Sequence, residues 1–114
     1  MKKFTYFIAC SNGDKGETIK PEYGYLFIDK LGNRYGASYN TKRGSGWHIT
    51  ELTTGLPVNI ERINKKADIQ PYIDNKSEAI SRILSERRPY IERLTMLISK
   101  AEKEGMTIWQ AKSN

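Results

Sequence analysis

Hydrophobic and polar side chains alternate along the first half of the chain, as they do in β-strands with one buried face. The glycine-containing stretches between these segments favour turns, and Gly32 and Asn33 suit a tight turn that reverses the chain. The pattern predicts antiparallel strands at residues 4–10, 23–30, 34–40 and 47–52. Residues 56–60 are a fifth candidate, restricted to a sheet edge because Pro57 has no N–H to donate.

The hydrophobic spacing changes near residue 60 to the three- and four-residue intervals of amphipathic helices. Asp68 is the expected N-cap of a first helix, with Pro71 in its first turn. A second helix is expected after Pro89 and should end at Gly105. The apolar stripes are Ile69, Tyr72, Ile73, Ile80, Ile83 and Leu84 in the first helix, and Ile91, Leu94, Leu97, Ile98 and Ala101 in the second.

These patterns predict the α+β class, with an antiparallel sheet of four to five strands followed by two C-terminal helices packed on one face. The 114 residues fit one domain, 1–114. Within it we expect the sheet in residues 3–60, the two-helix layer in 68–104 and a tail in 106–114. The apolar start of this tail, residues 106–110, is expected to dock on the core, although its sequence also allows an interface.

Composition favours a cytoplasmic globular protein. Hydrophobic residues make up 38% and charged residues 28% of the chain, which is typical of folded soluble domains. The single cysteine, Cys10, cannot close an internal disulfide, so a reducing compartment is expected. No apolar run reaches the length of a membrane span. The N-terminal residues are interpreted as a first strand and not as an export signal.

Catalytic and metal-binding chemistry have little support in the sequence. His48 is the only histidine, and together with Cys10 it provides too few ligands for zinc. Cys10 shares the alternation of Phe4 and Tyr6, which favours a small core residue over a nucleophile. The carboxylates are scattered, and the Gly44–Gly46 stretch lacks the lysine and the following helix of a phosphate-binding loop. We therefore expect no enzyme, no cofactor and no metal.

Positive charge is concentrated in one segment of the chain. The net charge is +6, and between Lys30 and Ile49 there is no acidic residue at all. Nine of the twelve aromatic residues lie in the first 47 positions. Aromatic rings on a sheet beside Lys and Arg side chains are typical of surfaces that bind nucleic acids, and the same residue types dominate protein interfaces. The candidate binding residues are Arg34, Tyr35, Tyr39, Lys42, Arg43, Trp47 and His48.

Two interpretations of this segment remain open. Residues 39–47 are either a basic loop that contacts phosphates or carboxylates, or a solvated connection between two strands. A secondary basic patch is expected where the two helices meet, at Arg82, Arg87, Arg88 and Arg93. It too has a simpler explanation, since charged runs on helices are usually solvated.

The favoured function is that of a small non-enzymatic binding protein. It resembles in size and composition the accessory inhibitors and adaptors of phages and plasmids, and it would bind an acidic surface of a protein or nucleoprotein. The alternative is direct nucleic-acid binding, with rings stacking on bases and Lys and Arg contacting phosphates. The sequence does not distinguish DNA from RNA and does not give the oligomeric state.

Overall fold

A computed structural model of the chain describes residues 2–11, 17–40, 46–86 and 88–104. Several predicted features lie outside these residues: Lys42 and Arg43 of the basic loop, Arg87, Gly105 as the helix end, and the 106–114 tail. The side chains of residues 88–91 also lie outside the description.

Within these residues the sheet has four antiparallel strands in the order β1-β2-β3-β4. They are β1 (Lys3–Ser11), β2 (Glu17–Ile28), β3 (Arg34–Asn40) and β4 (Gly46–Glu51). Each strand pairs with its neighbour in the chain. Three helices follow, so the predicted α+β class is confirmed. The candidate fifth strand at residues 56–60 makes only a single bridge, from Pro57 to Thr50, in the part of the chain that the structure describes.

The predicted first helix is divided into two, so the described residues contain three α-helices where two were expected. These are α1 (Ile69–Asn75), α2 (Ser77–Glu86) and α3 (Arg88–Lys103). The division falls at Lys76, whose backbone leaves the helical conformation. Asn75 and Ser77 flank it, and such short polar side chains favour helix ends because they compete for backbone hydrogen bonds. The apolar stripe alone did not reveal this break.

The start of α1 also differs in detail from the expectation. Asp68 occupies the N-cap position, but its side chain makes no capping hydrogen bond. A short 3-10 turn, η2 (Lys66–Asp68), precedes the helix instead. The turn carries backbone hydrogen bonds from Asp68 N to Lys65 O and from Ile69 N to Lys66 O. Backbone hydrogen bonds of this turn therefore begin the helix in place of a side-chain cap. Pro71 lies in the first turn, as predicted.

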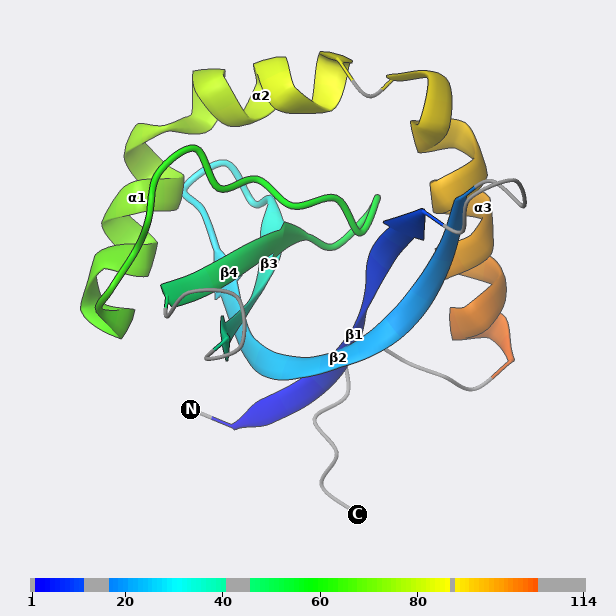
Figure 1. Ribbon diagram of the computed structural model, residues 1–114, viewed down its shortest axis with the longest axis horizontal. Helices are drawn as coiled ribbons and strands as arrows, with labels where there is room; N and C mark the ends of the chain where they lie inside the picture. Colours follow the sequence, from blue (N-terminus) through cyan, green and yellow to red (C-terminus); the bar gives the residue numbers. More distant parts are fainter. Residues whose placement is uncertain (1, 12–16, 41–45, 87, 105–114) are drawn as a thin grey trace.

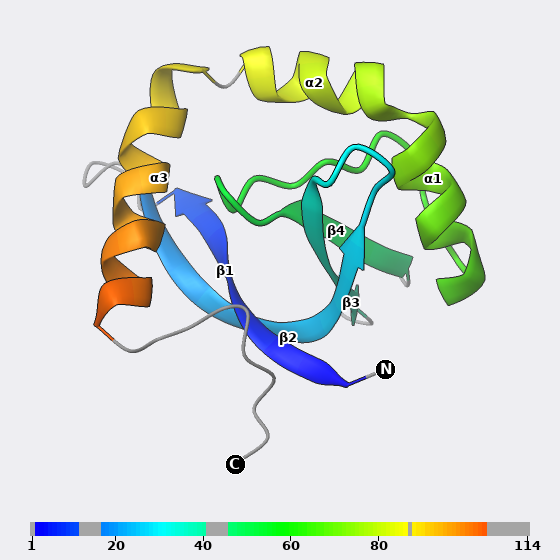
Figure 2. The ribbon, with the colours of Figure 1, turned by 180° about the vertical axis from the view of Figure 1, so that it is seen from behind.

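The helices form an arch along one side of a strongly curved sheet (Figure 1; Figure 2). Helix α1 contacts β2, α2 bridges the top, and α3 lies beside the hairpin of β1 and β2. Two hydrophobic clusters fill the space. The first contains Phe27, Tyr35, Ala37, Ile49, Val58, Ile63, Ile69, Tyr72, Ile73 and Ile80. The second contains Phe4, Tyr6, Phe7, Leu52, Ile98 and Ala101.

The sheet accommodates a tyrosine ring on its own backbone. Tyr6 is fully buried, and a Cβ placed on Gly36 would lie only 2.6 Å from the Tyr6 ring. A Cβ on Gly24 would collide with the backbone of Ala37. Glycines at both positions let the strands and the ring approach one another closely. This close packing ties β1 to the centre of the curved sheet.

The free edge of β4 is covered by the segment that follows it, residues 56–63. Backbone hydrogen bonds run from Glu51 N to Leu56 O, from Val58 N to Ile49 O and from Trp47 N to Ile63 O. The Asn59 side chain fills the remaining positions, since its Oδ1 accepts from Ile49 N at 2.7 Å. Its Nδ2 donates to Trp47 O at 3.0 Å. One amide side chain thus replaces the backbone of a neighbouring strand.

Tyr72 of α1 fastens this segment to the helices. Its hydroxyl donates to Val58 O at 2.7 Å and accepts from Ile60 N at 2.8 Å. The side chain is buried, and burial raises the pKa of the Tyr72 hydroxyl. The hydroxyl therefore stays protonated and can act as donor and acceptor at once.

Asp29 organises the turn between β2 and β3. Its Oδ1 accepts hydrogen bonds from the backbone N–H groups of Leu31 and Asn33. Its Oδ2 accepts from the Asn33 side chain and from the Tyr35 hydroxyl. Burial alone would raise the pKa of the Asp29 carboxyl, but these hydrogen bonds outweigh it and hold the pKa below its usual value.

Replacing Tyr72 by phenylalanine should lower the free energy of unfolding by about 1–3 kcal/mol, because the carbonyl of Val58 and the N–H of Ile60 lose their partner. Urea unfolding measures the change. Tyr39→Phe is the matched control, because Tyr39 is 47% exposed and its loss of a hydroxyl should stay within about 0.5 kcal/mol. Equal effects of the two substitutions would contradict the role given to Tyr72.

The lowered pKa of Asp29 predicts an acid-dependent contribution to stability. A carboxyl with a folded-state pKa below its unfolded value stabilises the fold above the unfolded pKa, near 3.9, and loses this effect as the pH falls through the folded pKa. The Asp29→Asn variant should be less stable than the parent at neutral pH. The difference in urea midpoint should shrink below about pH 4. A difference that stays constant down to acid pH would contradict the assignment.

Candidate binding face

Four aromatic residues and two lysines form one continuous surface on the sheet. The ring centroids of Tyr39 and Trp47 are 5.6 Å apart in an edge-to-face arrangement, and those of Trp47 and Tyr25 are 6.2 Å apart. Lys3 continues the series towards Tyr23. We name this surface the tyrosine face; its residues are Lys3, Tyr23, Tyr25, Tyr39, Trp47 and Lys66.

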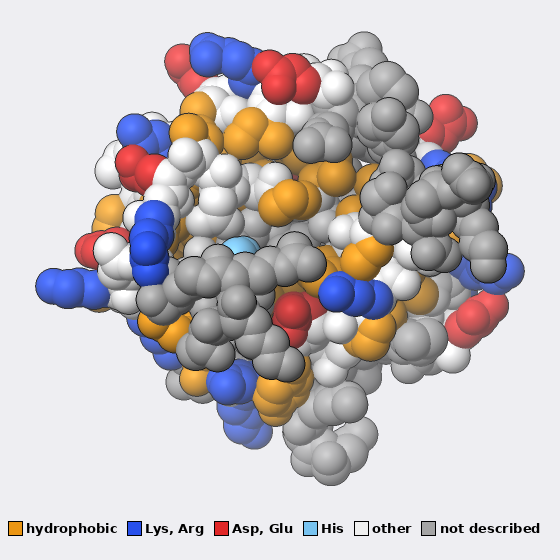
Figure 3. Space-filling model, in the orientation of Figure 1, with side chains coloured by type: hydrophobic (Ala, Val, Ile, Leu, Met, Phe, Trp, Pro, Cys, Tyr) orange, Lys and Arg blue, Asp and Glu red, His pale blue; other side chains and the backbone are white. Residues whose placement is uncertain are grey.

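Both lysines lie over aromatic rings. Nζ of Lys3 is 5.7 Å from the Tyr23 ring centroid and 5.6 Å from the Tyr25 centroid. Nζ of Lys66, in the η2 turn, is 3.6 Å from the Tyr25 centroid. These cation–π contacts hold two positive charges among the rings. In Figure 3, Lys and Arg side chains (blue) lie among hydrophobic ones (orange) at the lower left of the view.

Strand register explains why these residues share a face. Side chains alternate between the two faces of a sheet, and directly paired residues lie on the same one. Lys3 pairs with Tyr25 across β1 and β2. Tyr25 pairs in turn with Ala37, and Tyr39, two residues further along β3, pairs with Trp47.

The two central rings of the tyrosine face pack on the core, while its two outer rings are exposed to solvent. Tyr25 and Trp47 are half-buried and pack against the first hydrophobic cluster. The backbone N–H of Trp47 donates to Ile63 O, and its carbonyl accepts from the Asn59 side chain, so both polar groups of this residue are held in place. In contrast, Tyr23 is 48% and Tyr39 47% exposed. The face therefore offers two accessible rings on a rigid support.

Of the predicted candidates, the structure brings Tyr39 and Trp47 together, whereas Tyr35 lies in the covered part of the same sheet face. Tyr35 is 2% exposed and belongs to the first hydrophobic cluster. Its hydroxyl donates to Asp29, and burial together with the Asp29 charge raises the pKa of Tyr35. Alternation along β3 placed Tyr35 and Tyr39 on the same face correctly. It did not show that α1 covers one end of that face.

Arg34 and His48 are exposed but belong to the opposite alternation phase. Arg34 is the first residue of β3, at the end of the strand away from Tyr39. His48 pairs with Ser38, between the rows that hold Trp47 and Ile49. The candidate residues of the acid-free segment, residues 30–49, therefore lie on both faces of the hairpin of β3 and β4 and at both of its ends. The chain positions of Lys42 and Arg43 fall between Asn40 and Gly46, outside the described residues.

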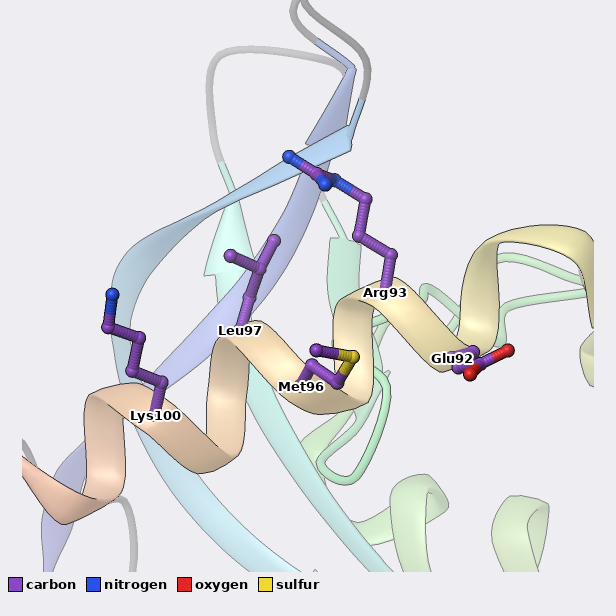
Figure 4. A pocket seen from close by; sticks show the side chains of 5 residues that line it. All are labelled: Glu92, Arg93, Met96, Leu97 and Lys100. Carbon is purple, nitrogen blue, oxygen red and sulfur yellow. The ribbon is translucent and has the colours of Figure 1, made fainter.

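The predicted secondary basic patch is only partly described. Arg82 on α2 and Arg93 on α3 are both exposed. An open hollow of about 390 Å³ lies on α3, lined by Glu92, Arg93, Met96, Leu97 and Lys100. Figure 4 shows Arg93, Leu97 and Lys100 projecting from the same side of the helix. The hollow combines both signs of charge with apolar side chains, which is not the composition of a phosphate site.

Sequence reasoning missed four members of the tyrosine face: Lys3, Tyr23, Tyr25 and Lys66. The two tyrosines carried a signal, since they alternate with the buried Phe27 on β2. Nothing in the sequence pattern linked Lys66 to Tyr25. The two residues meet only because residues 56–63 run back along β4 and bring the following turn over the sheet. Lys3 was in a predicted strand, but strand order was needed to place it beside β2.

The structure also shows where the side chains that could bind a metal or act in catalysis lie. Within the described residues, no cluster of three or more His, Cys, Asp or Glu side chains is placed to hold a metal ion. Cys10 pairs with Thr18 on β2, whereas His48 pairs with Ser38 on β3, so the register places them on different parts of the sheet. In the same part of the chain, no helix is long and apolar enough to cross a membrane.

Comparison of the chain with protein families, with curated proteins and with solved structures gives no match.

The edge contact between Tyr39 and Trp47 can be tested by fluorescence. In a Trp109→Phe background, Trp47 is the only tryptophan. Adding Tyr39→Ala should increase acrylamide quenching of Trp47 and cost about 0.5–1.5 kcal/mol of stability. Tyr23→Ala, on the far side of Lys3, is the matched control and should leave quenching unchanged. Unchanged quenching in the Tyr39 variant would show that the two rings do not touch.

Proposed function

We propose that the protein is a non-enzymatic binding protein that recognises an acidic partner through the tyrosine face. The observation that carries the proposal is the placement of Lys3 and Lys66 among rings that are themselves anchored on the core. Charge and aromatic area are thus presented together on one rigid surface. This combination favours electrostatic steering followed by close contact.

The absence of acid from the tyrosine face supports this choice. None of its six residues is acidic. Glu51 shares the alternation phase of Trp47, but it is buried and its carboxylate accepts hydrogen bonds from Thr53 and Thr54. The nearest negative charge of β4 is therefore already satisfied inside the protein. An incoming carboxylate or phosphate meets the lysines without a competing acidic side chain on the face.

Two kinds of partner fit this chemistry. An accessory inhibitor or adaptor would place the face on an acidic surface of a protein or nucleoprotein. A direct nucleic-acid binder would use the same lysines for phosphates and the rings for bases. The exposed rings of Tyr23 and Tyr39 favour the second kind, because a purely electrostatic contact needs no accessible ring faces.

Two charge-reversal variants with equal net charge test the proposal. Lys3→Glu with Lys66→Glu changes the tyrosine face, and Lys20→Glu with Lys103→Glu changes exposed lysines elsewhere. Each double substitution lowers the net charge by four units, from +6 to +2. Elution from immobilised heparin and from immobilised polyglutamate, in a salt gradient, is the measurement.

The Lys3/Lys66 variant should elute at a clearly lower salt concentration than the Lys20/Lys103 variant on at least one of the two columns. Both variants should remain folded, because all four side chains are exposed. The Lys3/Lys66 variant also loses its cation–π contacts, which are worth about 0.5–1 kcal/mol each at exposed sites. Equal decreases in retention would mean that only net charge matters, and the tyrosine face would then not be the binding surface.

A further inference from the structure

We propose that the tyrosine face binds single-stranded nucleic acid, with unpaired bases stacking on Tyr23 and Tyr39 and phosphates meeting Lys3 and Lys66. This inference rests on the proposed function and specifies the ligand class of the same surface. Three features support it: the exposure of the rings, the position of the cations between them and the rigidity of the support.

The two outer rings are suited to unpaired bases. Tyr23 and Tyr39 each leave nearly half of their surface accessible. The edge-to-face pair of Tyr39 and Trp47 leaves at least one face of the Tyr39 ring outside that contact. A base in a duplex is already stacked on its neighbours and cannot lie on such a ring, whereas an unpaired base can.

The cations lie where the backbone of a stacked strand would pass. Nζ of Lys3 lies between the Tyr23 and Tyr25 rings, at nearly equal distances from both centroids. Lys66 lies over Tyr25, in the middle of the face. Both cations thus lie in the series between the two outer rings, so a strand whose bases stack on Tyr23 and Tyr39 would carry its intervening phosphates past them. The lysines have flexible stems and can turn from the ring to a phosphate without moving the backbone.

The support reduces the cost of binding. Trp47 is fixed through Ile63 and Asn59, and Tyr25 packs on the core. Side chains that are already ordered lose little conformational entropy when a ligand arrives. An acidic peptide would engage the two lysines but would leave the rings of Tyr23 and Tyr39 unused. Bases provide the flat apolar partners that these rings lack.

Fluorescence anisotropy with labelled oligothymidine and oligouridine of about 12 nucleotides, within the usual site size, provides the test. A duplex of equal length and a labelled polyglutamate peptide are measured in parallel. The protein variants are Tyr23→Ala, Tyr39→Ala and Tyr39→Phe. None of these changes the net charge, so they separate stacking from electrostatics.

Each alanine variant should weaken single-strand binding about ten-fold, whereas Tyr39→Phe, which keeps the ring, should bind like the parent. The duplex should bind more weakly than either single strand. Lys3→Gln with Lys66→Gln should reduce the slope of log K against log salt by about 1.4, or about 0.7 for each phosphate that the protein no longer neutralises. A preference between oligothymidine and oligouridine would identify DNA or RNA as the source of the strand.

Single-strand affinity that is unchanged in both alanine variants would overturn the inference. If retention on the polyanion columns still depended on Lys3 and Lys66, the proposed function would survive with an acidic protein or duplex as partner. Tighter binding of polyglutamate than of either oligonucleotide would assign the face to an acidic protein. Cooperative urea unfolding of each variant confirms that it is folded, with Tyr39→Ala at the lower midpoint expected from the loss of its contact with Trp47.

Discussion

The hydrogen bonding along the outer edge of β4 is the constraint on which the rest of the architecture depends. Residues 56–63 and the Asn59 amide occupy this edge, and Tyr72 links the same segment to α1. The link determines where the helical arch begins relative to the sheet. It also brings Lys66 over Tyr25. The edge, the helices and the tyrosine face are therefore positioned by one short stretch of chain.

The parts of the fold that were predictable are those with a local signal. Alternation indicated all four strands, although β2 begins at Glu17, in a stretch expected to be a polar loop, and not at Tyr23. Helical spacing located the C-terminal half. The break at Lys76 escaped because Ile73 and Ile80 continue the same stripe on both sides of it. Residues 56–60 were expected as an edge strand and do lie along β4, but the Asn59 side chain takes over part of the pairing that a strand backbone would make. No hydrophobic period reveals such a substitution.

The candidate site was predictable in its residue types more than in its members. Tyr39 and Trp47 were placed together because a short hairpin fixes their register. Tyr35 was on the correct face, but whether a residue on that face is covered depends on where α1 packs. Lys3 and Lys66 lie far from the hairpin in sequence and meet it only in three dimensions. Long-range contacts of this kind leave no periodic trace in the chain.

Tyr6, whose ring is buried against Gly24 and Gly36, limits the stability of the fold at alkaline pH. Burial raises the pKa of Tyr6, and within the described residues its hydroxyl is the one buried side-chain polar atom without a full hydrogen bond. Ser38 and Glu22 influence that hydroxyl but are secondary to burial. Together with Tyr35 and Tyr72, it gives the fold three phenols that resist ionisation, whereas the unfolded chain ionises near pH 10. Their contribution to stability is complete below that pH and disappears as the solution becomes more alkaline. Tyrosinate absorbance from these three phenols should therefore develop only as the fold opens.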